Sequence, residues 1–436
     1  MVMPQKINRY LLVFFIVSTF FGNALSQSGA DFVSVKGTSL TLKGRPYYFV
    51  GTNYWYGSLL GLIGDRKKGV GRLRKELDFL KANGVTNLRL MAGVEGSGLI
   101  SGVTRVGPPL QPEQGVFDER VLDGLDLVLA EMRKRDMKAV IFLSNNWEWS
   151  GGFQQYLTWN GRVPGEMRAR KLTWDEQRDT VAKFYGCEPC KQAYDKQARL
   201  ILSRVNKINK IKYTDDPAIM AWELANEPRP MRPASGDEYK KWIAAAAAMI
   251  KARDPNHLVT TGHEGWIGTE GMPLFETVHA DKNIDYLTIH IWAKNWGWFK
   301  EDKLAEGFDN STSKAESYIR EHIPVSERLG KPLVIEEFGL PRDGISFDPA
   351  GPTTFRDRYY AKILAFIGSG PVAGANFWAF GGTARPVEGQ VFWKQGDDYM
   401  GDPPMEEQGL NTVFDGDLST WEVIRTAAVR AKGASK

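Results

Sequence analysis

Two acidic residues, Glu227 and Glu337, lie where a carboxyl group could take part in catalysis. Glu227 lies in Trp-Glu-Leu-Ala-Asn-Glu-Pro-Arg, residues 222–229, directly after an apolar run typical of a buried strand. Glu337 lies in Val-Ile-Glu-Glu-Phe-Gly, residues 334–339, at the end of another apolar run. Two such carboxyl groups suit cleavage of a glycosidic bond, because one protonates the leaving oxygen while the other attacks the sugar or activates water. We choose Glu337 over Glu336 because adjacent strand residues point to opposite faces.

The elements that would position these acids alternate along the chain. Eight apolar, β-rich runs are separated by segments with helical spacing of apolar residues. This alternation predicts a (β/α)8 TIM barrel, with a doubly wound parallel sheet as the alternative. The alternative requires a phosphate-binding glycine loop after the first strand, and Gly-Thr-Asn-Tyr at 51–54 lacks that pattern. The expected strands are 47–54, 87–91, 139–144, 219–224, 258–261, 286–291, 333–338 and 375–380, and the expected helices are 71–82, 117–135, 191–212, 239–253, 313–329, 354–367 and 419–431.

Long irregular segments follow several expected strands, at 93–115, 148–173, 292–307 and 384–407. In a barrel, long βα loops gather at the carboxyl ends of the strands, where binding and catalytic residues lie. The chain also has 14 Trp and 15 Tyr, many of them beside Gly, Asn or Pro. Flat aromatic rings in loops are suited to stack on sugar rings, so these loops predict a substrate groove. Its candidate platforms are Trp147, Trp149, Trp296 and Trp298.

Composition and charge exclude several classes of protein. The chain has 436 residues, 42% of them hydrophobic and 25% charged, as in folded globular proteins. A net charge of +4 without a Lys/Arg tract argues against a nucleic-acid partner. The five His lack the His-Glu-x-x-His spacing of a metalloprotease, and the Gly-x-Ser-x-Gly elbow of a serine hydrolase is missing. We therefore expect no metal and no cofactor.

The first residues have the pattern of a secretory signal peptide. A basic start precedes an apolar stretch at 11–21, which is too short to cross a membrane. The small residues Ala24 and Ser26 predict cleavage by signal peptidase after Ser26. An uncleaved membrane anchor is the alternative. Residues 1–26 would then be the signal peptide and residues 27–436 one secreted catalytic domain. We expect the mature chain to be a soluble monomer.

The chain has two cysteines, Cys187 and Cys190, separated by Glu-Pro. Export from the cell favours a local disulfide. Cross-linking so short a loop restricts the unfolded chain only slightly and adds little stability to the fold. This disulfide would therefore stiffen one loop. Redox catalysis is the alternative, but the surrounding sequence lacks a thioredoxin-like context.

Four motifs together resemble glycoside hydrolase family 5, and most closely its endo-β-1,4-mannanases. They are the stretch at 222–229, Gly-Thr-Asn-Tyr-Trp at 51–55, Asn-Asn-Trp at 145–147, and Glu-Glu-Phe-Gly at 336–339. The resemblance extends from about Tyr47 to Trp421. It implies a barrel enzyme that cleaves internal β-1,4 bonds of mannan, glucomannan or galactomannan with retention. Retention implies carboxyl groups roughly 5 Å apart.

The resemblance also implies roles for single residues. Glu227 would be the acid/base and Glu337 the nucleophile. Arg89 would hold Glu337 ionised, because a nearby positive charge favours the carboxylate. Asn226 would bind the 2-hydroxyl of the sugar at the cleavage point, and Arg229 would reach a sugar on the leaving side.

Two further residues, His290 and Trp378, match the family, whereas Trp292 departs from its pattern. His290 matches the family's sixth-strand histidine and Trp378 the floor of the cleavage subsite, although either side chain could simply fill the core. Trp292 stands where many members have a tyrosine that touches the nucleophile. An indole can donate a hydrogen bond there but cannot exchange a proton as a phenol does.

The identity of the sugar has an alternative within the same family. Many family cellulases carry a His after the third strand, where this chain has Asn-Asn-Trp at 145–147, and this difference favours mannan. A cellulase or another β-1,4-glycanase is the alternative enzyme. A non-catalytic glycan-binding barrel is the alternative outside enzymes, but it would not need both acids and Arg89.

Overall fold

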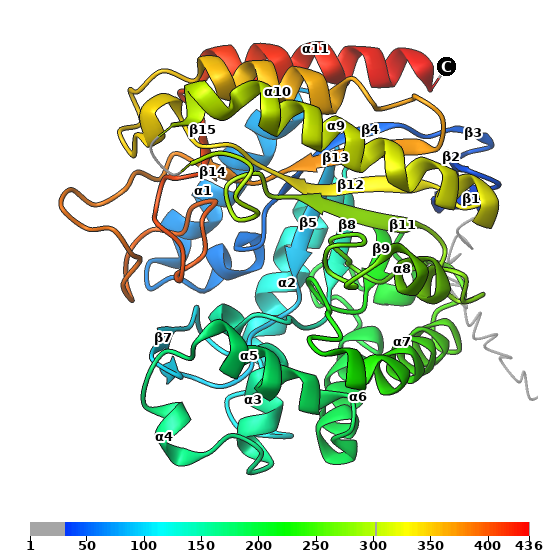
Figure 1. Ribbon diagram of the computed structural model, residues 1–436, viewed down its shortest axis with the longest axis vertical. Helices are drawn as coiled ribbons and strands as arrows, with labels where there is room; N and C mark the ends of the chain where they lie inside the picture. The colour runs from blue at the N-terminus through cyan, green and yellow to red at the C-terminus, as the bar shows by residue number, and fades with distance from the viewer. Residues whose placement is uncertain (1–30, 301–302, 436) are drawn as a thin grey trace, which may run out of the picture.

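The computed structural model describes residues 31–300 and 303–435 (Figure 1). Within them, eight parallel strands form one sheet in the order β10-β9-β8-β5-β4-β13-β12-β11. The predicted TIM barrel is confirmed, and the doubly wound sheet is excluded. The barrel strands are β4 (Phe49–Asn53), β5 (Asn87–Met91), β8 (Lys138–Phe142), β9 (Ile219–Glu223), β10 (Leu258–Thr260), β11 (Leu287–Ile291), β12 (Leu333–Phe338) and β13 (Val372–Phe377).

The two ends of this strand order, β10 and β11, meet and nearly close the barrel. The backbone N–H of Asp285 donates to the Val259 carbonyl at 2.8 Å, and the Asp285 carboxylate accepts from the Val259 N–H at 2.6 Å. Further along, the His290 N–H donates to the Glu264 carbonyl at 3.1 Å. Closure brings the carboxyl ends of all eight strands around one opening, where the long loops meet.

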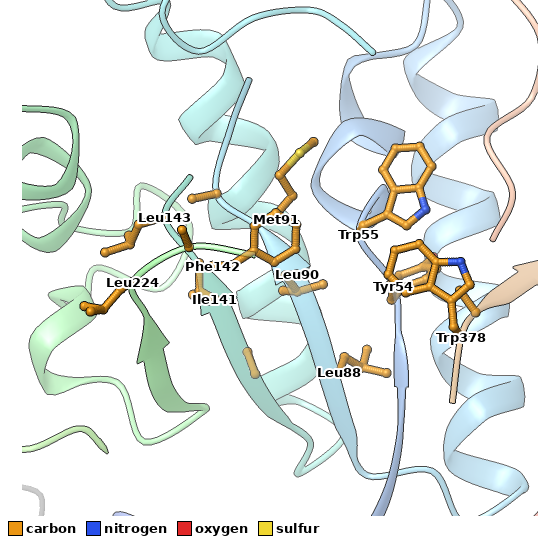
Figure 2. Packing of buried hydrophobic residues seen from close by; sticks show 14 of the residues in the cluster. Tyr54, Trp55, Leu88, Leu90, Met91, Ile141, Phe142, Leu143, Leu224 and Trp378 are labelled. Atoms are coloured by element: carbon orange, nitrogen blue, oxygen red, sulfur yellow. The ribbon is translucent and has the colours of Figure 1, made fainter. Parts of the chain in front are cut away.

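Every residue of the eight barrel strands is buried. Parallel strands covered by helices on one face and by the barrel interior on the other are expected to be apolar throughout. Figure 2 shows Leu88 and Leu90 of β5 and Ile141 of β8 among the side chains of this main core. The near-continuous apolar runs in the sequence therefore have a direct structural cause.

Eight helices follow the eight strands in turn and surround the barrel. Figure 1 shows α9, α10 and α11 along one side of the molecule and α6 and α7 on the opposite side. Asp65 and Asp118 cap α1 and α2 by accepting backbone N–H groups at 3.1 Å and 3.0 Å. The helices are α1 (Arg66–Ala82), α2 (Glu119–Arg133), α6 (Glu188–Leu202), α7 (Gly236–Lys251), α8 (Met272–His279), α9 (Leu304–Leu329), α10 (Thr354–Leu364) and α11 (Leu418–Ala434).

Smaller elements decorate both ends of the barrel. An antiparallel sheet of β1 (Ser34–Lys36), β2 (Ser39–Leu42) and β3 (Arg45–Pro46) packs Leu40 in a second core with Phe49, Val140 and Met220. The two-stranded pairs are β6 (Leu99–Ile100) with β7 (Val103–Thr104) and β14 (Phe380–Gly382) with β15 (Val413–Phe414). Short 3-10 helices are η2 (Gly57–Leu62), η3 (Glu148–Ser150), η4 (Ala182–Phe184), η5 (Tyr213–Asp215), η6 (Pro233–Ser235) and η7 (Asp343–Ile345).

The connection from β8 to α6 contains three helices that were not predicted, the first two of them inside the segment 148–173 that the sequence predicted to be irregular. They are α3 (Gly152–Trp159), α4 (Gly165–Arg168) and α5 (Trp174–Val181). A disulfide joins Cys187 and Cys190 where this connection enters α6, as the local pairing predicted. The bond therefore fixes the start of one helix and spans only this short turn.

Three other predicted boundaries were wrong. The last barrel strand, β13, occupies residues 372–377 rather than 375–380, and α9 begins at Leu304 rather than at residue 313. The helix expected to reach residue 212 ends at Leu202, and beyond it Arg204 donates to the Asp126 carboxylate at 2.8 Å. The short helix α8 was not predicted.

The predicted signal peptide, residues 1–26, lies outside the described residues, and the division of the chain into this segment and a domain at 27–436 stays a prediction. Among the helices of the described part, none is both long and apolar enough to cross a membrane.

Candidate active site

The loops after β8, β9, β10, β11 and β13, together with the end of β12, enclose one cavity of about 500 Å³. Its walls include most of the residues predicted from the sequence: Trp147, Asn226, Glu227, Arg229, Trp292, Glu337 and Trp378. The other two, Arg89 and His290, are completely buried beside the acids and do not line the cavity. The barrel therefore brings together residues that are up to about 290 positions apart in the chain.

Glu227 and Glu337 face each other in this cavity. One carboxyl oxygen of each lies within 4.8 Å of the other. This proximity agrees with the roughly 5 Å of retaining glycosidases and is too short for the wider spacing of inverting enzymes. Glu227 also has a positive φ of 52°, a left-handed backbone conformation that is unfavourable for a residue with a Cβ. The surrounding loop holds this conformation, since the Glu227 N–H donates to the Gly262 carbonyl at 2.9 Å.

Three donors surround the Glu337 carboxylate. Arg89 forms a short ion pair with one oxygen. The Trp292 indole N–H donates to the other at 3.1 Å, and His290 Nδ1 lies 3.3 Å from that same oxygen. The indole at position 292 therefore reaches the nucleophile candidate, at the position where many family members were expected to have a tyrosine.

Arg89 is the centre of the buried network below the cavity. It donates to the Glu223 carboxylate through Nε and Nη2 at 2.8 Å and 2.5 Å, to Asn53 at 3.0 Å and to Asn226 at 2.7 Å. Burial raises the pKa of Glu223 to about 8, although Arg89 acts in the opposite direction. Arg89 therefore links the orientation of Asn226 to that of Glu337, because one planar guanidinium contacts both.

Glu227 accepts hydrogen bonds from two sides. The Trp147 indole N–H donates a short hydrogen bond to one oxygen, and His290 Nδ1 lies 2.6 Å from the other. Burial lowers the pKa of His290, but the carboxylates of Glu337, Glu227 and Glu336 outweigh burial and raise it well above its ordinary value. This direction favours the protonated imidazole, and His290 Nδ1 lies between the two acids as a donor.

The neighbour of the nucleophile candidate, Glu336, is buried and does not line the cavity. Strand alternation predicted that only one of the two adjacent glutamates would face the site, and Glu337 is the one that lines it. The pairing of β11 with β12 has a bulge here, since Ile289 pairs with residue 335 and His290 pairs with Glu337. Glu336 is the extra residue, and it lies 3.8 Å from Arg89 and 3.7 Å from His290. Both glutamates therefore reach the buried network, because a bulge breaks the alternation.

Two tryptophans and a glycine form the wall beside Glu337. The rings of Trp292 and Trp378 meet edge to face, with centroids 5.6 Å apart. A Cβ at Gly339 would lie 3.1 Å from the Trp292 ring and 3.3 Å from the Trp378 carbonyl, so a side chain there would push the wall outward. The Trp378 indole N–H is buried without a partner, which leaves a donor for a ligand.

Arg229 lines the cavity beside Glu264 and Trp147. Its guanidinium binds the Glu264 carboxylate, with one contact at 2.5 Å, and lies 5.0 Å from the centre of the Trp147 ring. Burial raises the pKa of Glu264, against the effect of Arg229. The Arg229 charge is thus already paired, so it offers hydrogen bonds and a flat face rather than a free cation.

Several cavity residues were not predicted. They lie on loops without a recognisable motif, and only the fold brings them to the cavity; they are Trp174, Glu264, Ile267, Asn295, Met405 and Glu406. Burial and the nearby acids raise the pKa of Glu406 well above its ordinary value, and one of its oxygens is buried without a partner. Of the platforms proposed from the sequence, Trp147, Trp149 and Trp296 line the cavity, whereas Trp298 packs against Trp296 outside it.

Within the described residues, one set of side chains is close enough to hold a metal ion, namely Glu227, His290 and Glu337. Its environment opposes a cation, however. Arg89 and Trp292 already donate to Glu337, Trp147 donates to Glu227, and His290 carries its own positive charge. The arrangement is suited to acid–base and nucleophilic chemistry by the two carboxyl groups.

A TIM barrel with two facing carboxyl groups in a tryptophan-lined cavity defines a glycosidase. Residues 30–436 match the family described as GH family 5 beta-mannosidase-like, and the chain belongs to glycoside hydrolase family 5. Mannan endo-1,4-beta-mannosidase 4 of Solanum lycopersicum is 30% identical over 85% of this chain and 90% of its own length.

Solved structures agree with this membership. The family 5 mannosidase of Rhizomucor miehei has a TM-score of 0.83 and 30% identity, covering 94% of this chain and 99% of its own. The endo-1,4-beta-D-mannanase of Thermotoga petrophila has a TM-score of 0.66 and 24% identity, covering 88% of this chain and all of its own, and supports the fold.

Proposed function

We propose that this protein is a retaining endo-β-1,4-mannanase that hydrolyses internal bonds of mannans. The observation that carries this proposal is the carboxyl pair of Glu227 and Glu337, whose nearest oxygens lie within 4.8 Å in the sugar-sized cavity. Such spacing supports double displacement, because it leaves no room for water between the second carboxylate and the sugar. The mannan-cleaving relatives support β-linked mannose as the sugar.

In the first step, a Glu337 oxygen attacks the anomeric carbon, and the bond to the leaving oxygen breaks. Arg89 and Trp292 hold the carboxylate oriented and ionised until attack. Asn226, held at its side-chain oxygen by Arg89 at 2.7 Å and donating to Asn145 at 3.1 Å, presents an amide beside the position of the sugar 2-hydroxyl. These fixed partners reduce the reorganisation needed at the transition state.

The proton for the leaving oxygen comes from Glu227, whose carboxyl group lies 2.6 Å from His290 Nδ1. The negative charge of Glu337 is the largest effect that raises the pKa of His290. That charge disappears when Glu337 becomes a glycosyl ester. Glu227 then takes a proton from water, and the resulting hydroxide attacks the anomeric carbon and releases Glu337.

A second candidate, an exo-acting β-mannosidase, is favoured by one observation. The chain is structurally more similar to the Rhizomucor miehei mannosidase than to the Thermotoga petrophila endo-mannanase, with TM-scores of 0.83 and 0.66. Both enzymes would use the same carboxyl pair and differ in whether the chain end or an internal bond enters the cavity. A cellulase differs in the orientation of the 2-hydroxyl that Asn226 meets.

Product analysis separates these functions. The endo-mannanase releases short mannooligosaccharides from mannohexaose at the earliest times, whereas an exo-mannosidase releases mannose alone and a cellulase prefers cellohexaose. Proton NMR of the first product should show the β-anomer. The variants Glu227→Gln and Glu337→Gln should lose activity on mannan, and full activity of either would refute the assignment of the acid pair.

We also propose that the protein is secreted as a monomer after loss of residues 1–26. The basic and apolar start of the chain supports export, and the disulfide between Cys187 and Cys190 is typical of an oxidising compartment. N-terminal sequencing of the secreted protein should begin at residue 27, and size-exclusion chromatography with light scattering should give the mass of one chain.

A further inference from the structure

Glu95 is a buried carboxyl group that the proposed mechanism does not use. It follows β5, is completely inaccessible to solvent and is not among the residues that line the cavity. Four groups donate hydrogen bonds to its two oxygens: the Gly152 N–H at 3.0 Å, the Ser144 hydroxyl at 3.0 Å, the Tyr156 hydroxyl at 3.2 Å and the Gln197 amide at 2.7 Å. Since buried polar groups are costly when left unpaired, this carboxyl group fixes the segments that carry its donors.

These contacts do not depend on a single protonation state of Glu95. Burial raises the pKa of Glu95 to about 7, whereas the hydrogen bonds from its donors act in the opposite direction. A carboxylate accepts from all its donors, and a protonated carboxyl group can still donate to the Ser144 or Tyr156 oxygen, because a hydroxyl both donates and accepts. The neighbouring Arg105 guanidinium donates to the backbone carbonyl of Glu95 at 3.1 Å. The role of Glu95 therefore depends on the reach of its side chain more than on its charge.

Two of the donors, Ser144 and Gly152, stand at the two ends of a loop that follows β8, the loop 144–152. Each end binds a different oxygen of Glu95. The loop also rests on the backbone of Glu95, because the Glu95 N–H donates to the Ser150 carbonyl at 2.9 Å. Glu95 therefore joins both ends of this loop at its base.

From this loop, hydrogen bonds lead to the acid/base candidate. The Asn145 side-chain oxygen accepts from the Trp147 backbone N–H at 3.0 Å, and the Trp147 indole donates to Glu227. The same Asn145 oxygen accepts from the Asn226 amide at 3.1 Å, but Asn226 is also held by Arg89 at 2.7 Å. A displacement at the base of the loop should therefore move the Trp147 indole away from Glu227 while Asn226 stays in place.

We propose that Glu95 is a positioning residue for the acid/base: by joining both ends of the loop 144–152, it holds the Trp147 indole against the Glu227 carboxyl group. The inference rests on the proposed function, since it takes Glu227 as the group that protonates the leaving oxygen. Glu95 does not line the cavity, so its removal should weaken proton transfer and leave attack by Glu337 largely intact. The effect should therefore depend on how much the leaving group needs a proton.

Two substrates with the same sugars and different leaving groups measure this dependence. Dinitrophenolate departs from 2,4-dinitrophenyl β-mannobioside without a proton, whereas the leaving oxygen of phenyl β-mannobioside needs one. Because kcat/KM reports the steps up to the first bond cleavage, it isolates the step in which Glu227 acts as an acid. A positioned acid contributes about 10²- to 10⁴-fold, so Glu95→Ala should lower kcat/KM about 10- to 100-fold on the phenyl substrate and less than about threefold on the dinitrophenyl substrate.

Two conservative variants separate the reach of the side chain from its charge. Glu95→Gln keeps the length of the side chain and one oxygen for the donors, so it should recover most of the activity on the phenyl substrate. Glu95→Asp keeps the charge but is too short to bind both ends of the loop, so it should show an intermediate loss on that substrate alone. If Glu95→Ala does not fold, these two variants carry the same comparison.

Asp126→Ala is the matched control for loss of a buried carboxyl group. Asp126 is also completely buried and accepts from a tyrosine hydroxyl, that of Tyr213 at 2.7 Å, but it is not among the cavity-lining residues. Its replacement should lower stability in urea unfolding and leave the ratio of the two kcat/KM values unchanged.

Three outcomes would overturn the role of Glu95. An equal loss on both substrates would mean that it only supports the fold, and unchanged values for Glu95→Ala would mean that the loop is held without it. Better recovery by Glu95→Asp than by Glu95→Gln would mean that charge matters rather than contact with the loop. Failure of the proposed function is a separate result, read from Glu227→Gln. That variant should lose activity on the phenyl substrate and keep its kcat/KM on the dinitrophenyl substrate, and full activity on both would refute Glu227 as the acid.

Discussion

Replacing Arg89 by Met tests the buried network below the cavity. Arg89 makes five hydrogen bonds, to Asn53, Asn226, Glu337 and twice to Glu223, and is completely inaccessible to solvent. Methionine fills much of the volume but leaves the carboxyl groups without their counter-charge. Removing one partner of a buried ion pair costs about 3–5 kcal/mol, so we expect the free energy of unfolding at neutral pH to fall by that amount.

Activity should fall for a related but separable reason. Glu337 loses a charge-assisted hydrogen bond that orients it, and such a bond contributes about 1.5–3 kcal/mol. If that amount is lost from the transition state, kcat/KM on mannohexaose falls roughly 10- to 150-fold. Urea unfolding and steady-state kinetics on the same preparations measure the two effects.

The double variant Arg89→Met/Glu223→Gln separates stability from activity. Glu223 contacts Arg89 but is not among the residues that line the cavity. Replacing it with an amide removes the carboxyl group left unpaired, so much of the lost stability should return. Activity should stay low, since Glu337 still lacks its donor. Recovery of both, or a single Arg89→Met variant as stable and active as the parent, would refute this account.

Variants at three further positions test other buried polar groups of the molecule. Trp292→Phe removes the indole donor to Glu337 and should lower kcat for an aryl mannobioside about tenfold or more. Trp292→Tyr should retain more activity if its hydroxyl reaches the same oxygen. Stopped-flow measurement of nitrophenol release tests both variants. Burial raises the pKa of Glu95 from 4.5 to about 7. Between these pH values the folded state keeps a proton that the unfolded chain releases. The free energy of unfolding should therefore fall as pH rises through that interval, by up to about 3 kcal/mol. Glu95→Gln should flatten this dependence in urea titrations across the interval, and an unchanged slope would contradict the raised pKa. Burial and nearby acids also raise the pKa of Glu406 well above its ordinary value, which favours the protonated carboxyl group. Glu406→Gln keeps a neutral group of the same shape and should leave KM on mannohexaose close to that of the parent, whereas Glu406→Ala should raise it.

The barrel could be predicted because its strands are buried on both faces. Such strands must be apolar from end to end, and that pattern is visible without a structure. The β13 boundary was missed because Trp378-Ala-Phe continues the apolar run past the residue where pairing ends. The helices α3, α4 and α5 were missed because they have only four to eight residues each, and helices this short are marginal without tertiary contacts.

Site residues could be predicted where a strand end or a motif marks them. Glu227, Glu337 and Arg89 all follow or belong to apolar runs, so the fold class alone places them near one opening. Trp174, Glu264 and Glu406 have no such marker, and their role depends on how three separate loops meet. The inward position of Glu336 was missed because a strand bulge leaves no trace in the alternation of residue types.

That bulge gives the enzyme a specific vulnerability. Deleting a residue from residues 333–335 would shift the rest of β12 by one position along β11, so that Glu337 takes the place of Glu336 and Glu336 takes the place of Ile335. Composition, net charge and strand length would barely change, yet the attacking oxygen would leave the sugar's reach. The reaction therefore depends on the exact number of residues in this short strand as much as on the two acids themselves.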